Sequence, residues 1–259
     1  MLADARRTEI VSAVTRERVV RVSDLADLLG VSLVTVRRDI EALNDAGLVQ
    51  KIHGGAKVPG AAGTHEPGFE LKSTQGTAEK QAIAREAVKL VSDGMAIGLS
   101  AGTTTWALAK ELVGKKNLTV VTNSMRIADV FASPRSQVAV ILTGGERTPS
   151  DALVGPIATA SMRQLHLDVL FLGVHGVDGV AGFTTPNLLE SEMNRALIGA
   201  ARTVVVLADH SKWGTVGIST IAALEEVDEV ISDELLGTEA RRTLRERVGT
   251  LRLVSVPSQ

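Results

Sequence analysis

Apolar residues recur with a helical period in two segments near the start of the chain. The first stripe consists of Leu25, Ala26, Leu28 and Leu29, and the second of Val36, Ile40 and Leu43. Each spacing predicts an amphipathic helix with one buried face. Ser23 and Ser32 are suitable N-caps, and Gly30 suits the left-handed conformation that ends a helix. We therefore predict two helices joined by a turn of about three residues, as in a helix-turn-helix.

The face opposite the second stripe carries polar and basic side chains. At about 100° per residue, Thr35, Arg37 and Arg38 point away from the core, and Ser32 precedes them. Arginine contacts guanine edges or phosphates in the major groove, so this arrangement suits a recognition helix. Two packed helices with a solvated charged face are the alternative. Charge does not decide, because residues 1–57 hold nine Lys/Arg and eight Asp/Glu.

The rest of the chain shows a different pattern. Residues 58–76 hold two Pro and four Gly without an apolar period, which predicts a linker. Beyond it, apolar β-branched runs alternate with amphipathic segments, as in βαβ units with a mostly parallel sheet. The predicted strands are Ala96–Leu99, Leu118–Val121, Val138–Leu142, Val169–Val174, Thr203–Ala208, Val230–Ser232 and Leu251–Val256. The predicted helices are Ala78–Leu90, Trp106–Leu112, Ile157–Leu165, Leu188–Ala201 and Thr238–Arg247. We expect an α/β protein with a helical domain over residues 1–57, its helix-turn-helix at about 20–39, and a doubly wound domain over 77–259.

Composition excludes several classes of protein. Hydrophobic residues make up 44% and charged residues 22% of the 259, with a net charge of −2, as in an ordinary globular protein. The absence of Cys excludes disulfide scaffolds and thiolate metal sites. The five histidines have no metal-ligand spacing, so we expect neither a metal nor a resident cofactor. The chain shows neither a signal-like h-region nor an apolar run of the ~18 residues that a membrane span needs, so we expect a cytoplasmic protein with no membrane partner.

Polar or glycine-rich segments follow three predicted strands. They contain Ser100, Gly102, Thr103 and Thr104; then Asn123 and Ser124; then Gly144 and Gly145. Ligands of open parallel sheets bind outside the carboxyl ends of the strands, and a helix N-terminus binds anions. A plain strand-to-helix turn with a Thr N-cap is the alternative for the first segment. Together the three predict a pocket for a phosphate.

Two later loops add functional groups. His175 and Asp178 follow the strand at Val169 within a glycine-rich loop, which we expect to bring them towards a ligand. Lys212 follows the strand at Thr203 and is either a solvated side chain or a phosphate ligand. Glu190 opens a predicted helix, where compensation of the helix dipole is the slightly preferred interpretation.

The segment VSxxTVRRDIxxLxxAGLVxxxHGGA, from Val31 to Ala56, resembles the winged helix-turn-helix of DeoR-type bacterial transcription regulators. The resemblance implies a wing formed by Gly47–Lys51 and the HGGA segment, with Lys51 and His53 at backbone phosphate or the minor groove. A turn that only closes the wing is the alternative for His53. We expect Asp39 to orient an arginine rather than touch DNA, because phosphate repels a carboxylate.

The later motifs resemble the DeoR sensor domain. They are Glu79-Lys80, Gly102-Thr103-Thr104, Val121-Thr122-Asn123, Thr143-Gly144-Gly145, Leu153-Val154-Gly155 and Asp209-x-Ser211-Lys212. The resemblance implies a fold related to ribose-5-phosphate isomerase and the CoA-transferases, and a phosphorylated sugar or similar metabolite as effector. The family often has Asp where this chain has Ser100, so an acceptor for sugar hydroxyls is absent there.

Three functions compete. We favour a sequence-specific transcriptional regulator, a repressor released from operator DNA by a phosphorylated metabolite, and not an enzyme. A palindromic or repeated operator suits a homo-oligomer, a dimer or tetramer. The alternative is a sugar-phosphate isomerase with an accessory DNA-binding domain, with Asp178 as base and Lys212 as electrostatic partner. A purely architectural DNA binder is the third interpretation, and the pocket motifs argue against it.

Overall fold

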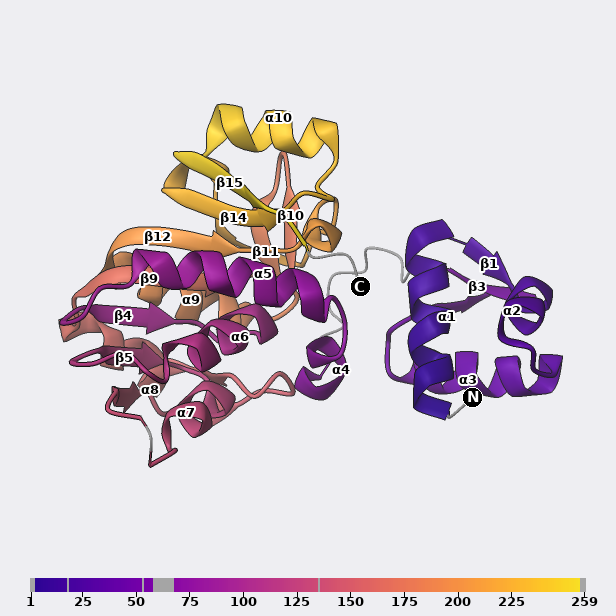
Figure 1. Cartoon of the computed structure of the whole chain (residues 1–259), viewed down its shortest axis with the longest axis horizontal. Coiled ribbons are helices and arrows are strands. Elements are labelled where there is room, and N and C mark those ends of the chain that lie inside the picture. Colours follow the sequence, from indigo (N-terminus) through magenta and orange to yellow (C-terminus); the bar gives the residue numbers. More distant parts are fainter. Residues whose placement is uncertain (1–2, 18, 53, 58–67, 135, 257–259) are drawn as a thin grey trace. The chain divides into compact units, whose positions relative to one another are not determined.

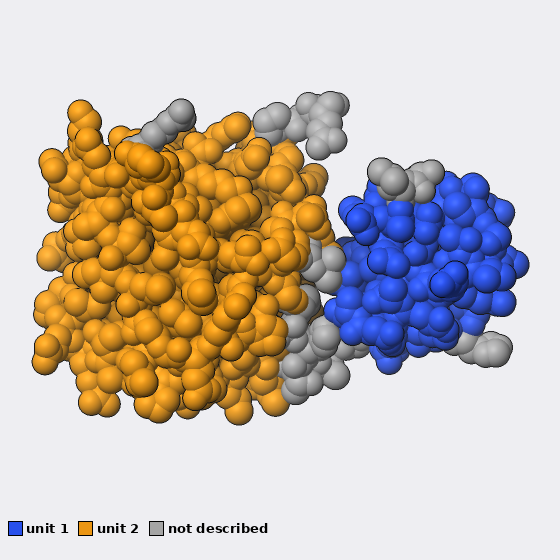
Figure 2. All heavy atoms as spheres, turned by 90° about the horizontal axis from the view of Figure 1, so that it is seen from below, with its two compact units in different colours: residues 1–67 blue, residues 68–259 orange. Residues whose placement is uncertain are grey.

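The computed structural model describes residues 3–17, 19–52, 54–57, 68–134 and 136–256. The chain forms two compact units, residues 1–67 and residues 68–259 (Figure 2). Within the described ranges, no helix is long and apolar enough to span a bilayer.

The described residues of the first unit form three helices, labelled in Figure 1, and a small antiparallel sheet. The strand order of this sheet is β1-β3-β2. Its elements are α1 (Ala3–Glu17), β1 (Val19–Arg21), α2 (Val22–Leu29), α3 (Leu33–Asp45), β2 (Gln50–Ile52) and β3 (Gly55–Lys57). The core contains Ile10 of α1, Leu25 of α2 and the predicted stripe Val36, Ile40 and Leu43 of α3. The strands β2 and β3 form the hairpin of a wing, so the unit is a winged helix-turn-helix.

Two details of α2 differ from the prediction. The helix begins at Val22, and Ser23 does not cap it. The Val22 N–H instead donates to Gly54 O at 2.9 Å, so the backbone of the wing satisfies a donor at the start of the helix. Leu28 is 54% exposed, because the buried stripe is centred on Leu25, Ala26 and Leu29 and leaves it at the margin. Gly30 ends the helix in the left-handed region at φ 62° as predicted.

The second unit is built on a seven-stranded parallel sheet with the order β15-β14-β12-β9-β4-β5-β6. Its strands are β4 (Ala96–Leu99), β5 (Thr119–Thr122), β6 (Ala139–Leu142), β9 (Leu167–Gly173), β12 (Ala201–Leu207), β14 (Glu229–Asp233) and β15 (Thr250–Val254). Each contains most of one of the seven predicted strands. Alternate residues of β9 face opposite sides of the sheet: Val169 and Phe171 belong to one hydrophobic cluster, Leu170 and Leu172 to the other. Burial on both faces explains the continuous apolar runs.

Helices cover both faces of this sheet. Buried residues of α5 (Thr77–Ala87), α6 (Thr103–Leu112) and α7 (Met125–Phe131) pack in the cluster with Phe171. Buried residues of α8 (Pro156–Ser161), α9 (Leu188–Ala200) and α10 (Thr238–Arg247) pack in the cluster with Leu172. Short 3₁₀ helices complete the chain: η1 (Val88–Leu90), η2 (Met162–Gln164), η3 (His210–Lys212) and η4 (Leu224–Glu226). The unit is therefore a doubly wound α/β domain, as predicted.

Several elements were not predicted. A second, antiparallel sheet has the order β10-β11-β13, from β10 (Gly176–Asp178), β11 (Gly182–Thr185) and β13 (Ser219–Ala222). The strands β7 (Glu146–Arg147) and β8 (Leu153–Val154) form a short pair. The helix α4 (Phe69–Ser73) lies in the predicted linker 58–76 but belongs to the second unit. The linker prediction is wrong for this segment, because Phe69 is buried edge-to-face against Trp106 at 5.4 Å between ring centroids.

Candidate functional site

The solvent side of α3 gathers four residues that the sequence predicts to contact DNA. Ser32 caps the helix, and its hydroxyl accepts the Thr35 N–H at 3.2 Å. The hydroxyls of Ser32 and Thr35 lie 2.9 Å apart. Arg37 and Arg38 are exposed in the following turn. We call the side chains of Ser32, Thr35, Arg37 and Arg38 the α3 face.

Asp39 lies on the other side of α3 and is buried. Its carboxylate accepts hydrogen bonds from Arg6 Nε at 2.5 Å and Arg7 Nε at 3.2 Å, both on α1. The expectation that Asp39 orients an arginine is confirmed, and the arginines lie on α1 rather than on α3. The pair ties α1 to α3, and so holds the recognition helix against the core.

The wing is anchored to the same helix. The Lys51 N–H donates to Asn44 Oδ1 at 2.9 Å, and Lys51 Nζ lies 2.5 Å from Glu41 Oε1. The hydrogen bond and charge of Lys51 hold the pKa of Glu41 below its ordinary value. The Lys51 side chain is about half exposed, so it keeps access to an anionic partner. His53 lies outside the described residues.

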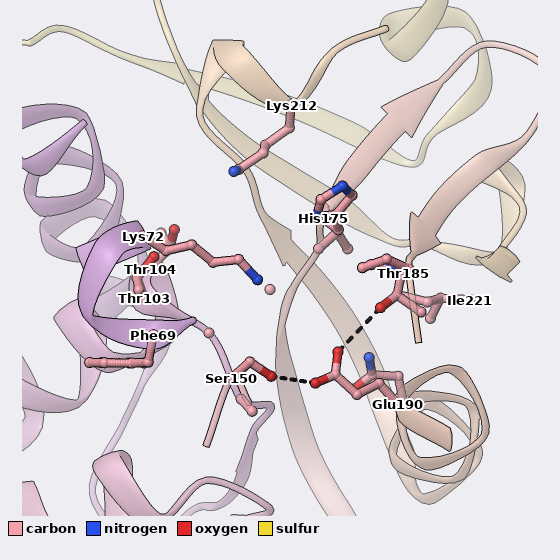
Figure 3. A pocket seen from close by; sticks show the side chains of 16 residues that line it. Phe69, Lys72, Thr103, Thr104, Ser150, His175, Thr185, Glu190, Lys212 and Ile221 are labelled. Carbon is pink, nitrogen blue, oxygen red and sulfur yellow. Dashed lines mark hydrogen bonds between the residues drawn. The ribbon is translucent and has the colours of Figure 1, made fainter. Parts of the chain in front are cut away.

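A pocket opens in the second unit near the carboxyl ends of β4 and β9. It brings together five predicted residues: Gly102, Thr103, Thr104, His175 and Lys212 (Figure 3). Gly102 to Thr104 form the start of α6, where the first backbone N–H groups have no partner within the helix. A helix N-terminus with an adjacent lysine favours a bound anion.

Two buried acids, Asp209 and Asp233, fix the turn that carries Lys212. Asp209 accepts hydrogen bonds from the backbone and the hydroxyl of Ser211, which fixes the turn η3. Burial opposes ionisation of Asp209, but the positive charges of Lys212 and Lys80 and the bonds from Ser211 keep its pKa below the ordinary value. His210 Nδ1 lies 2.9 Å from Asp233 Oδ1, and this bond raises the pKa of His210.

The helix α4 contributes a second lysine to the pocket. Lys72 and Phe69 both line it. Lys80 Nζ donates to Lys72 O and Gln75 O at 2.6 Å each, so a buried ammonium binds the C-terminal end of α4 to the unit. Burial, with the nearby charge of Lys212, lowers the pKa of Lys80 to about 8. In Figure 3 the amino groups of Lys72 and Lys212 point towards the same part of the pocket.

Another part of the pocket is anionic and rich in hydroxyl groups. The Glu190 carboxylate accepts hydrogen bonds from Ser150 Oγ at 2.5 Å and from Thr148 Oγ1 and Thr185 Oγ1, both at 3.2 Å. Glu190 lies in the first turn of α9, as the dipole interpretation expects, but it also lines the pocket. The pocket therefore offers cationic groups at one place and a carboxylate with hydroxyl groups at another.

Six predicted residues do not line this pocket, and most bind the neighbouring backbone instead. Ser100 Oγ accepts the Gly173 N–H at 2.9 Å, and Asn123 Oδ1 accepts the Ala101 N–H at 2.9 Å. Ser124 caps α7. Asp178 accepts the N–H groups of Val180 and Ala181 in the β10–β11 turn, and these bonds lower its pKa. Asp178 therefore does not line this pocket, and its carboxylate stabilises the turn.

The remaining two are Gly144 and Gly145, both with positive φ. A Cβ at Gly145 would lie 2.4 Å from Val154 O, so glycine is required there by close backbone packing. Sequence reasoning missed Phe69, Lys72, Ser150, Thr185 and Asn194 as lining residues. The first two lie in the predicted linker, and the others reach the pocket through elements whose pairing no local pattern specifies.

Two family models match the chain. The DeoR-like helix-turn-helix domain covers residues 6–61, and the DeoR C terminal sensor domain covers residues 75–234. The chain belongs to the DeoR family of transcriptional regulators. As a member of this family it is a DNA-binding regulator.

Relatives of this DeoR-family chain match nearly its whole length. It is 37% identical over 245 residues to the HTH-type transcriptional regulator GlpR of Haloferax volcanii, covering 94% of the chain and 95% of GlpR. It is 32% identical to the putative aga operon transcriptional repressor of Escherichia coli O157:H7, covering 93% and 90%. It is 31% identical to the glycerol-3-phosphate regulon repressor of Escherichia coli K12, covering 88% and 90%. All three are named as regulators, which confirms the expectation that the chain is not an enzyme.

Solved structures resemble only part of the chain. A D-ribose-5-phosphate isomerase in complex with phospho-erythronic acid is 20% identical, with a TM-score of 0.39 and 52% of each chain covered. Ribose 5 phosphate isomerase A from Neisseria gonorrhoeae is 20% identical, with a TM-score of 0.40 and 56% of each chain covered. The match spans about half the length of each isomerase.

Proposed function

We propose that this DeoR-family regulator is a sequence-specific repressor of a sugar or related metabolic operon. It binds operator DNA through the α3 face, with Lys51 of the wing at the phosphate backbone. A phosphorylated metabolite bound in the pocket of the second unit releases it. Two copies of the winged helix-turn-helix on a repeated operator require a homo-oligomer, a dimer or tetramer.

One observation carries the effector class. Lys72, Lys212 and the first residues of α6 line one pocket, so two cations and a helix N-terminus are available to the same anion. A phosphate monoester, with its near-double negative charge, fits this end. One relative, the glycerol-3-phosphate regulon repressor, is named for a phosphate monoester.

The other end of the pocket supports a polyhydroxylated effector. Glu190 accepts hydrogen bonds from three hydroxyl groups, and hydroxyl donors of an effector suit the same carboxylate. Ser100 is buried and bonded to Gly173, so it offers no carboxylate. Glu190 is then the acid that recognises the hydroxyl groups of the effector.

The isomerase alternative loses its proposed base. Asp178 is bonded within the β10–β11 turn and does not line the pocket. Proton abstraction needs a carboxylate available to the substrate, and the carboxylate in this pocket, Glu190, already accepts hydrogen bonds from three hydroxyl groups. In this proposal the pocket binds the effector, and the first unit responds by releasing DNA, as in a ligand-controlled regulator.

Calorimetric titration of the full chain tests both halves of the pocket. A thermal-shift screen of phosphorylated sugars and polyols first identifies an effector, because a ligand of the folded state raises the melting temperature. Lys212→Gln removes a charge-assisted hydrogen bond and should weaken the binding of this compound by about 1.5–3 kcal/mol. It should weaken the binding of inorganic phosphate by a similar amount. Glu190→Gln should weaken the binding of the polyhydroxylated compound but not the binding of inorganic phosphate.

Lys116→Gln is the matched control, because Lys116 is exposed and does not line the pocket. Operator affinity without effector should stay near wild type in all three variants. Wild-type affinity of Lys212→Gln for both ligands would refute the phosphate assignment. Equal loss of both ligands in Glu190→Gln would refute the hydroxyl assignment.

A further inference from the structure

The first turn of α3 exposes two large aliphatic side chains. Leu33 is 47% exposed and Val34 is 64% exposed, although the stripe on the opposite side of the helix is fully buried. Side chains four residues apart share one side of a helix, so Leu33 lies above Arg37 and Val34 above Arg38. The solvent side of α3 therefore carries two aliphatic side chains beside Thr35 in its first turn and two arginines in its second.

This arrangement restricts what covers the two side chains. Single exposed aliphatic residues are ordinary, but here two neighbours share a surface with two arginines at the start of a recognition helix. The arginines and the positive helix N-terminus attract a polyanion. A partner must thus be strongly anionic overall and still present apolar groups at the depth of the first turn. Duplex DNA meets both conditions, because the thymine 5-methyl group is an apolar group on the major-groove edge.

We propose that Leu33 and Val34 read thymine methyl groups in the operator, while Arg37 and Arg38 contact guanine edges or phosphates. The inference rests on the proposed function, because it requires operator binding through α3. Residues at the N-terminal end of a recognition helix are those that reach base edges. The Ser32 cap and its bond to the Thr35 hydroxyl hold this turn in helical form, so the two aliphatic side chains are presented in a fixed geometry.

Deoxyuridine provides a test that leaves the protein unchanged. Binding sites are first selected from a random duplex library with the full chain, and each thymine of the preferred site is replaced in turn by deoxyuridine. The replacement removes only the methyl group. We expect one or two thymines per half-site at which affinity falls about fourfold, the effect of one buried methyl group. The remaining thymines should tolerate the replacement.

Protein variants locate the contact. Val34→Thr keeps the β-branched shape and replaces a methyl by a hydroxyl, and Leu33→Ala shortens the side chain while favouring the helix. Each should bind the thymine site about fourfold more weakly than wild type and should be insensitive to deoxyuridine at one position. Val180→Thr and Leu235→Ala are matched controls, because these residues of the second unit are 96% and 61% exposed. They should behave as wild type.

The outcomes separate this inference from the function beneath it. Enrichment of no sequence from the library would overturn operator binding itself. A selected site without any methyl-sensitive thymine would overturn the reading by Leu33 and Val34 alone. So would variants that keep the full deoxyuridine effect, since the methyl contact would then lie elsewhere. Variants that change the oligomeric state in sedimentation, with DNA affinity unchanged, would assign the two side chains to a protein contact instead.

Discussion

The α3 face and the pocket of the second unit are built in different ways. The α3 face lies within residues 32–38, and the helical period determines which of its side chains point to solvent. The pocket collects side chains from separate elements, from Phe69 in α4 to Ile221 in β13. A contiguous site depends on local helix geometry, whereas a dispersed site depends on strand order and on the loops between strands.

The two sites also differ in how they are held. The α3 face is rigid because its helix packs on a hydrophobic stripe and is pinned by one buried carboxylate. Beside the pocket, the charge of Lys212 acts on two buried groups, and it lowers the pKa of both Lys80 and Asp209. We therefore expect a single substitution to disrupt the α3 face. Ligand binding in the pocket should instead change gradually with pH and with single substitutions.

The largest effect should come from Asp39→Ala. It leaves Arg6, whose side chain is only 13% exposed, without its carboxylate partner. The change removes two charge-assisted hydrogen bonds between α1 and α3, so the free energy of unfolding of the first unit should fall markedly. The first unit should unfold earlier in denaturant while the transition of the second unit stays in place.

The exposed pair between Glu41 and Lys51 gives the control for this variant. Glu41→Gln removes a surface ion pair and should change the stability of the first unit little. Equal stability of Asp39→Ala and wild type would mean that α3 is held by its apolar stripe alone.

Lys80 should make the second unit more stable at alkaline pH. Its pKa falls from 10.5 to about 8 on folding, so between these values the unfolded chain binds more protons than the folded chain. Stability then rises with pH across this window, and the burial penalty is fully present below pH 8. The full change corresponds to about 3 kcal/mol.

The measurement is the stability difference between wild type and Lys80→Met as a function of pH. Other groups titrate equally in both proteins and cancel, so the difference should grow in favour of wild type between pH 8 and 10.5. A difference that stays constant with pH would show that Lys80 is protonated to the same extent in both states.

Arg38→Ala tests the contiguous site. It should weaken operator binding by about 1–3 kcal/mol if Arg38 reads a base, and should relax the preference at one position of the site. Lys51→Ala should weaken binding to all sequences alike and reduce the salt dependence by about one charge. Fluorescence anisotropy at several salt concentrations distinguishes the two. If both variants changed sequence preference and salt dependence alike, Arg38 and Lys51 would not have the separate roles of base contact and backbone contact.

The sequence predicts the regular parts of the fold because their causes are local or repeated. All seven strands of the parallel sheet are predicted, since burial on both faces requires continuous apolar runs. The Ser32 cap and the stripe of Val36, Ile40 and Leu43 are predicted for the same reason. The short strands β10, β11 and β13 are not, because they are rich in small and polar residues, and β13 pairs with β11 across a long stretch of chain.

The pocket is predicted only in outline. Strand ends at one edge of a parallel sheet indicate where a ligand binds, and five of the predicted residues lie there. Which polar side chain faces the ligand depends on the backbone of each loop. Ser100, Asn123 and Asp178 satisfy backbone N–H groups, while Glu190 and Ser150 meet across the pocket from elements forty residues apart. No pattern along the sequence predicts the contact between Glu190 and Ser150.

The smallest effect should come from Thr103→Val, which removes one neutral hydroxyl from a dispersed site. Thr103 lines the pocket in the first turn of α6, and valine keeps its shape. A neutral hydrogen bond contributes about 0.5–1.5 kcal/mol, so effector binding should weaken less than in Lys212→Gln. Thr250→Val, at an exposed residue at the start of β15, is the control.

Linkage sharpens the test of Thr103→Val. The factor by which effector lowers operator affinity must equal the factor by which operator lowers effector affinity. Thr103→Val should leave this factor unchanged while shifting the effector concentration needed for release, because the lost contact weakens effector binding equally with and without operator DNA. Titrations of effector with and without operator DNA measure both quantities. A changed factor would place Thr103 in the transmission between the two units rather than in ligand binding.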